Sequence, residues 1–141
     1  MKKILLADND ESVSQMLGQV LELERYQVLR SRTGRETTAM LQAELPDLVL
    51  LDLNLPERNG WQIYDLIHQT CPSTPIIIIT ALSCQQERAA SLGAILMEKP
   101  LDLPLLLELI RGSLAGPEVE AEHLSRADEH RHEVIQPNTS R

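Results

Sequence analysis

The chain of 141 residues carries 21 acidic side chains against 13 basic ones, a net charge of −8, and 43% of its residues are hydrophobic. This length is typical of one domain, and the hydrophobic share is large enough for a core. The negative charge disfavours direct nucleic-acid binding, which requires a basic face, and a basic membrane anchor. No apolar run approaches the roughly 18 residues that span a bilayer, and Cys71 and Cys84 lack the spacing of a metal site. We therefore expect a cytoplasmic protein with reduced thiols.

Short apolar runs alternate with longer amphipathic stretches along the chain. The runs predict strands at 3–7, 27–31, 48–52, 75–80 and 94–98. The stretches between and after them predict helices at 11–24, 35–44, 60–69, 84–92 and 102–114. Because 49–51 and 76–79 are apolar without alternation, their strands should be buried on both faces, as in a parallel sheet. The more polar strand 27–31 should lie nearer an edge.

Strands that alternate with helices imply right-handed crossovers and helices on both faces of the sheet. The expected fold class is α/β, a doubly wound five-stranded parallel sheet of order 2-1-3-4-5 in a flavodoxin-like three-layer sandwich. This domain should occupy residues 1–115. Residues 116–141 are acidic, contain three histidines and have few apolar side chains, so we expect a partly disordered tail with a short helix near 117–133.

Helical spacing of the apolar residues predicts which helix faces are buried. The inward stripes are Ala39, Met40 and Ala43 in 35–44, and Leu103, Leu106, Ile110 and Leu114 in 102–114. Leu105 and Leu109 fall outside the second stripe. Either the core is broad there, or the two leucines form an exposed patch of the kind that usually marks a partner surface. We favour the exposed patch.

Polar side chains follow the predicted strands, at the sheet edge where doubly wound folds bind ligands. They are Asp8, Asn9 and Asp10 after the first strand, Asp52 at the end of the third, Thr80 at the end of the fourth and Lys99 after the fifth. One Asp after a strand is usually a helix cap or turn former, but four such positions in register are hard to explain in that way. Close carboxylates are tolerated when a divalent cation neutralises them, and Mg²⁺ prefers oxygen ligands. A carboxylate beside Mg²⁺ can attack a phosphoryl group, whose oxygens a lysine and a hydroxyl can then bind.

Residues 2–115 resemble the receiver domain of two-component response regulators, including the chemotaxis type. The resemblance rests on ILLADNDES after the first strand, DLNLPERNG after the third, and TAL and EKPL after the fourth and fifth. It implies that Asp52 is the phospho-acceptor, Thr80 the switch hydroxyl and Lys99 the phosphate partner. It also implies a Mg²⁺ site made by Asp8, Asp52, the residue at position 9 and the backbone carbonyl of Asn54.

Two residues depart from the family pattern. Asn9 stands where receivers commonly have a second acid that binds the metal directly. Its amide carries no charge, so we expect weak Mg²⁺ binding, and Asp10 could compensate only if the turn shifted by one residue. Leu96 stands where many receivers have a Tyr or Phe that rotates inward on activation, so switching should be weaker or use backbone shifts. The resemblance further implies a cis peptide bond between Lys99 and Pro100.

The expected function is that of a receiver that accepts phosphate from a sensor histidine kinase or phosphotransfer protein and then binds another protein. It would not be an enzyme beyond its own phosphotransfer and autodephosphorylation. One alternative is a degenerate receiver that docks without phosphorylation, which Asn9 and Leu96 keep open. Another is a Mg²⁺-dependent phosphohydrolase with Asp8 as nucleophile, although such enzymes need a longer chain and a later acidic pair.

The expected partner surface is the face formed by 84–92, 94–98 and 102–114, where a downstream protein or a second copy would bind. No contact with nucleic acid or membrane is expected. The histidines of 130–133 could bind a metal, but a solvated tail provides no preformed geometry, so we do not expect a site there.

Overall fold

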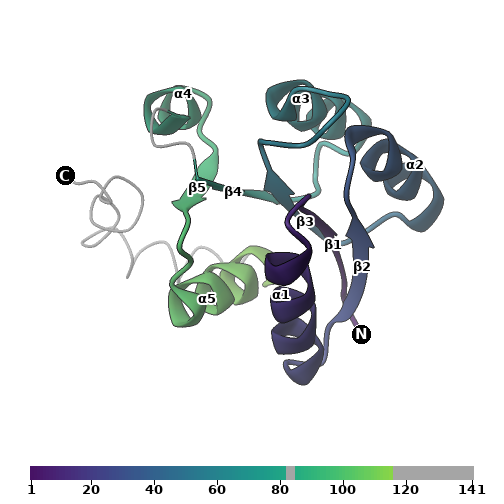
Figure 1. Ribbon diagram of the computed structural model, residues 1–141, viewed down its shortest axis with the longest axis vertical. Coiled ribbons are helices and arrows are strands. Elements are labelled where there is room, and N and C mark those ends of the chain that lie inside the picture. The colour runs from purple at the N-terminus through teal and green to yellow at the C-terminus, as the bar shows by residue number, and fades with distance from the viewer. Residues whose placement is uncertain (82–84, 116–141) are drawn as a thin grey trace. The chain divides into compact units, whose positions relative to one another are not determined.

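The computed structural model describes residues 1–81 and 85–115, in which strands and helices alternate (Figure 1). The elements are β1 (Lys3–Ala7), α1 (Glu11–Leu23), β2 (Gln27–Ser31), α2 (Gly34–Glu44), β3 (Leu48–Asp52), α3 (Gly60–Thr70), β4 (Ile76–Thr80), α4 (Gln86–Ser91), β5 (Ile95–Glu98) and α5 (Leu103–Leu114). Every strand and helix predicted within residues 1–115 is present, with ends close to those expected. Cys84 and the tail 116–141, with its 130–133 segment, lie outside the described residues.

The strands form one parallel sheet in the order β2-β1-β3-β4-β5, which confirms the predicted doubly wound fold. β3 and β4 are buried along their whole length, as their continuous apolar runs indicated. β2 lies at an edge of the sheet, as its polar composition indicated. Its exposed Arg30 is bonded to α1, through Nε to the hydroxyl of Ser14 at 2.8 Å and through Nη2 to Glu11 at 2.9 Å.

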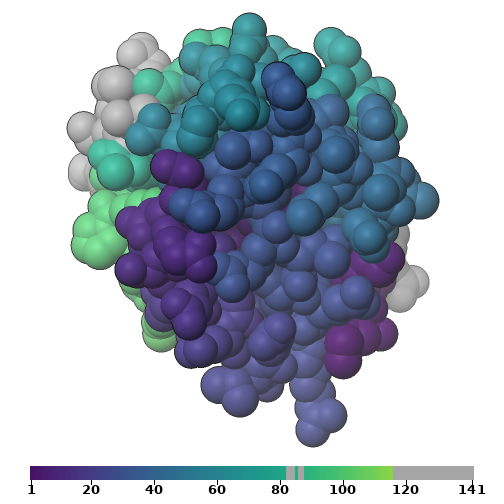
Figure 2. Space-filling view, turned by 45° about the vertical axis from the view of Figure 1, so that its right-hand side comes forward, coloured from purple at the N-terminus to yellow at the C-terminus, as the bar shows by residue number. Residues whose placement is uncertain are grey.

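The described chain divides into two compact units, Met1–Ile78 and a second that begins at Ile79. In the first unit α1 lies on one face of the strands, while α2 and α3 lie side by side on the other (Figure 1). The side chains of β1 and β3 are therefore enclosed between helices, and Ile4, Leu5 and Leu50 are fully buried. Figure 2 shows the surface of this unit, whose purple to teal residues make up most of the visible face.

The prediction of which face of α2 is buried is wrong. Its buried residues are Gly34, Thr37 and Leu41, whereas Ala39 and Ala43 are exposed and Met40 is half-buried. Thr37 can be buried because its hydroxyl donates to the Thr33 carbonyl at 2.7 Å and bonds the Ser31 hydroxyl at 2.8 Å. A polar residue with both hydrogen bonds satisfied costs little to bury.

In the second unit α5 begins at a cap, since the Asp102 carboxylate accepts the N–H of Leu105 at 3.1 Å. Leu106 and Ile110 are fully buried, as predicted. The other four leucines of the prediction, Leu103, Leu105, Leu109 and Leu114, are all half-buried. The expected contrast between an inward stripe and an exposed Leu105/Leu109 patch is therefore wrong, because the helix is apolar on most of its surface.

Candidate functional site

Asp8 follows β1 and is fully buried. Its N–H donates to the Ser31 carbonyl at 3.0 Å, which extends the contact between β1 and β2 by one residue. Its carboxylate oxygen Oδ1 accepts the N–H of Asp10 at 2.8 Å. Asp10 in turn caps α1, because its own Oδ1 accepts the N–H of Val13 at 3.2 Å. The Asp10 carboxylate is thus engaged in the cap, and Asn9 lies exposed on the turn.

Asp52 ends β3 and is 5% exposed. Ala7 of β1 lies opposite Leu51 of β3, so Asp8 and Asp52 occupy the next position of two neighbouring strands. The structure therefore brings the two predicted carboxylates together at one end of the sheet. Asp52 Oδ1 accepts the N–H of Asn54 at 2.9 Å, and Asn54 itself is exposed.

A loop, residues 53–59, connects Asp52 to α3. Gly60 closes it by donating its N–H to the Leu53 carbonyl at 3.2 Å. A Cβ on Gly60 would lie 2.5 Å from that carbonyl oxygen, so no other residue fits here without moving the backbone. Asn59 caps α3, and its side chain and that of Gln62 bond each other's backbone N–H groups in a capping box. Gly60 therefore shapes the loop after Asp52.

The carboxylate pair suits a magnesium ion. Mg²⁺ binds oxygen, keeps several waters and often uses only one or two protein carboxylates. Asp8 and Asp52 provide two such groups, and a cation stabilises buried carboxylates at the ends of neighbouring strands. Within the described part of the chain, no three His, Cys, Asp or Glu side chains gather as a metal site.

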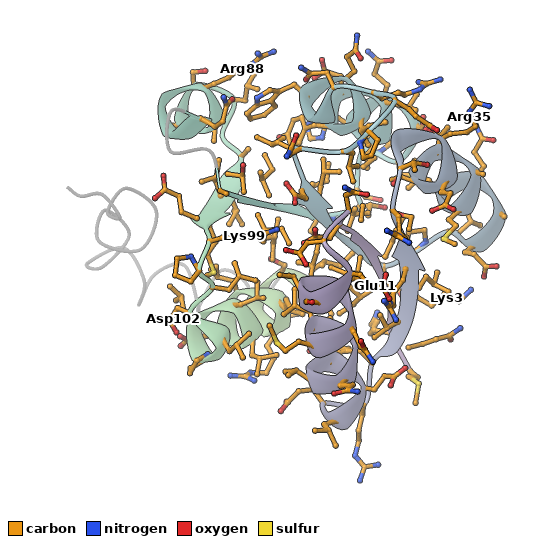
Figure 3. The ribbon with its side chains drawn as sticks, in the orientation of Figure 1. Lys3, Glu11, Arg35, Arg88, Lys99 and Asp102 are labelled. Atoms are coloured by element: carbon orange, nitrogen blue, oxygen red, sulfur yellow. The ribbon has the colours of Figure 1, made fainter. Side chains whose placement is uncertain are left out.

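In the second unit, the ends of β4 and β5 hold Thr80 and Lys99. The Lys99 N–H donates to the Thr80 carbonyl at 2.8 Å, so the backbones of the two residues are in contact. Thr80 is fully buried, and Lys99 lies half-buried at the end of β5 (Figure 3). The Lys99–Pro100 bond is cis, as predicted. Leu96 is buried in β5.

Three rings line one side of α3. Trp61 and Tyr64 are buried and meet edge to face, with ring centroids 5.5 Å apart. The exposed His68 stacks on Tyr64 at 5.4 Å. Burial raises the pKa of the Tyr64 phenol, and the negative charge of Asp65 raises it further. Trp61 and Tyr64 are therefore packing residues, and His68 adds a ring contact at the exposed side of Tyr64.

Sequence reasoning missed two residues that touch the loops bearing the acids. The Ser31 carbonyl accepts the N–H of Asp8, and the Gly34 N–H donates to the Pro56 carbonyl at 3.0 Å. The available signal was a Thr-Gly pair, residues 33–34, at the point where a strand gives way to a helix. A glycine there often indicates a close approach of two backbone segments.

Residues 4–111 match the family described as the response regulator receiver domain, and the chain belongs to that family. It is a phospho-accepting receiver of two-component signalling, a class of signalling modules rather than enzymes. The phosphohydrolase alternative is therefore set aside. Among the described residues, no helix is long and apolar enough to cross a membrane.

Several known proteins are similar to this chain. It is 31% identical over 115 residues to Response regulator MprA of Mycolicibacterium vanbaalenii, an alignment that covers 79% of the chain and 50% of MprA. It is 34% identical over 92 residues to Transcriptional regulatory protein CpxR of Escherichia coli, which covers 65% of the chain and 39% of CpxR. The chain thus spans half or less of the length of these relatives.

Solved structures show the same fold. A CheY-like receiver domain protein from Methanospirillum hungatei is 30% identical with a TM-score of 0.77, covering 86% of this chain and 98% of that one. Response regulator TrrA from Thermotoga maritima, solved in complex with Mg²⁺ and BeF, is 26% identical with a TM-score of 0.75. That alignment covers 81% of this chain and all of TrrA.

Proposed function

We propose that Asp52 accepts a phosphoryl group from the phosphohistidine of a cytoplasmic sensor kinase or phosphotransfer protein, and that this modification changes which protein the chain binds. The observation that carries the proposal is a carboxylate only 5% exposed at the end of a wholly buried strand, one strand away from the buried Asp8. Burying two adjacent carboxylates is unfavourable for stability alone. Such a pair is explained by chemistry that uses both.

In the proposed reaction, a carboxylate oxygen of Asp52 attacks the phosphorus of phosphohistidine. The P–N bond breaks, its electron pair stays on the imidazole that leaves, and an acyl phosphate forms. In a separate later step, water attacks the phosphorus of the acyl phosphate, the P–O bond to Asp52 breaks, the carboxylate is regenerated and inorganic phosphate is released. We assign the Thr80 hydroxyl and the Lys99 ammonium group to the phosphoryl oxygens. The backbone contact between Thr80 and Lys99 supports a shared role.

Asp8, Asn9, Asp52 and the Asn54 carbonyl would hold Mg²⁺, which neutralises negative charge on the carboxylates and the transferred group. We propose that this binding is weak. Asn9 contributes no charge, and the Asp10 carboxylate is engaged in capping α1. Ligand charge is a main determinant of affinity for such cations.

Phosphorylation by acetyl phosphate with Mg²⁺ tests the assignment, with the modified residue mapped by mass spectrometry. We expect one phosphoryl group on Asp52, none in Asp52→Asn, and wild-type labelling in the control Asp65→Asn, which changes an exposed acid of α3. Label on Asp8 would restore the phosphohydrolase alternative. A folded protein that takes no label even at high Mg²⁺ would instead be the docking module.

We further propose that the face formed by α4, β5 and α5 binds a downstream protein or a second copy. The support is the set of half-buried leucines on α5, which includes Leu105 and Leu109. Sedimentation of wild type and Leu105→Glu/Leu109→Glu, with and without a phosphoryl mimic, tests this surface. The control is Leu23→Glu, since Leu23 is 83% exposed on α1. We expect a weak dimer that strengthens with the mimic and is lost only in the double variant.

A further inference from the structure

The first turn of α2 packs directly against the loop that follows Asp52. Gly34, the first residue of α2, is buried and donates its N–H to the Pro56 carbonyl at 3.0 Å. A Cβ added to Gly34 would lie 2.6 Å from Cβ of Arg58 and 2.9 Å from its Cγ. Side-chain carbons do not approach so closely, and ordinary contact begins at 3.4 Å. The two segments therefore fit together only because residue 34 has no side chain.

Two further features of the loop lie beside this contact. Glu57 has a φ of 76°, in the left-handed region that is unfavourable for a residue with a side chain. Such a conformation persists when its surroundings hold it in place. Arg35, labelled on α2 in Figure 3, pairs with Glu57 at 3.8 Å between Nε and Oε1. Residues 56, 57 and 58 are thus each in contact with the start of α2.

The same connection also reaches the other carboxylate. Just before α2, the Ser31 carbonyl accepts the N–H of Asp8 at 3.0 Å. The segment 31–35 therefore touches the residue after β1 through Ser31 and the loop after β3 through Gly34. Asn54 lies within that loop and donates its N–H to Asp52. A displacement at Gly34 can therefore reach Asp8 through Ser31, and Asp52 through the loop that contains Asn54.

We propose that Gly34 is a positioning residue for phosphoryl transfer, acting through Pro56 and Arg58 on Asn54 and Asp52. The chemical part of this inference rests on the proposed function of Asp52. Moving the two carbons from 2.6 Å to 3.4 Å requires a shift of about 0.8 Å. Misplacement of reacting groups by about 1 Å can slow a reaction as much as 100-fold, so the effect on phosphorylation should be large compared with the small change in the side chain.

The variant Gly34→Ala tests the inference, and Arg58 provides the rescue. We expect Gly34→Ala to slow acetyl phosphate labelling by about tenfold or more. Gly34→Ala/Arg58→Gly should return to near the wild-type rate, because it removes the carbon that clashes. Gly34→Ala/Arg58→Ala should stay slow, because alanine keeps the Cβ that lies nearest. Arg58→Gly alone controls for added loop flexibility and should label at close to the wild-type rate.

The amide signal of Asn54 provides a readout that needs no phosphorylation. In ¹⁵N NMR spectra of the unmodified protein it should shift in Gly34→Ala and return only in the Arg58→Gly double variant. If the wild type takes no phosphate but this pattern of shifts holds, the proposed function of Asp52 is wrong, whereas the coupling between Gly34 and Asn54 is supported. An unmoved Asn54 signal in folded Gly34→Ala, or equal rescue by Arg58→Ala and Arg58→Gly, would overturn the inference.

A second variant covers the case in which Gly34→Ala does not fold. The Thr33 hydroxyl caps α2 by accepting the N–H of Glu36 at 3.0 Å, and Thr33→Val removes that bond without adding bulk. It should loosen the first turn of α2 and speed exchange of the Asn54 amide. Asp102→Ala, which uncaps α5, is the matched control and should leave that amide unchanged. Unchanged exchange in Thr33→Val would count equally against the inference.

Discussion

The loops that follow β1 and β3 begin in the same way and are held in different ways. In each, an aspartate accepts the N–H of the residue two positions later, at 2.8 Å for Asp8 and 2.9 Å for Asp52. After Asp8 the helix begins within three residues, so the cap at Asp10 fixes the turn locally. After Asp52 the chain runs through 53–59 and is held from outside, by Gly34 and by the start of α3. Both loops contain local bonds, but the longer one also depends on the distant contact of Gly34 with Pro56.

Of the substitutions in these two loops, Gly60→Ala in the longer one should have the largest effect on stability. The added methyl would press on the backbone of Leu53, which cannot rotate away, so we expect a loss of about 3 kcal/mol in the free energy of unfolding. Urea denaturation followed by circular dichroism measures it. Gly18→Ala is the control, since its Cβ would lie 3.7 Å from the nearest atom and alanine favours a helix interior. Equal stability of the two variants would show that the Leu53 contact does not hold the loop.

In the shorter loop, Asn9→Asp tests how the charge at position 9 affects Mg²⁺ binding. It places a third carboxylate next to the pair, so Mg²⁺ affinity should rise by about tenfold, or 1.4 kcal/mol. The metal-free protein should lose stability because the carboxylates repel. Titration followed by Trp61 fluorescence or calorimetry measures the affinity. Asn54→Asp adds the same charge to the longer loop, where the proposed ligand is a backbone carbonyl, and should raise affinity much less. Equal gains would indicate a general charge effect.

The smallest effect expected is that of Asp10→Ala. Loss of an N-cap costs about 1 kcal/mol, because the N–H of Val13 loses its partner. Asn59→Ala removes the corresponding cap at the end of the longer loop and should cost a similar amount. Urea denaturation of both variants tests this. The idea that the shorter loop is fixed by its cap fails if Asp10→Ala is as stable as wild type.

The sequence predicted the strands well because each is a short apolar run bounded by polar residues, and it placed Asp8 and Asp52 at neighbouring strand ends for the same reason. It failed on α2, where a buried Thr37 depends on two hydroxyl partners that apolar spacing does not register. It failed on α5 because leucine occurs on most of the helix surface, so the spacing of apolar residues does not distinguish a buried face from an exposed one. The contact of Gly34 with the loop 53–59 joins residues far apart in the chain, and no local pattern encodes such a contact.

The position of β2 at the edge of the sheet bears on how these molecules behave at high concentration. An edge strand leaves a row of N–H and C=O groups that can template a strand from another chain and start aggregation. β2 is five residues long and carries Arg30, whose guanidinium is held by Ser14 and Glu11. A strand that docked along this edge would have to remove water from this charged group, which is unfavourable. We therefore expect a short, charged edge strand of this kind to disfavour fibre-like growth, while the inner strands stay apolar.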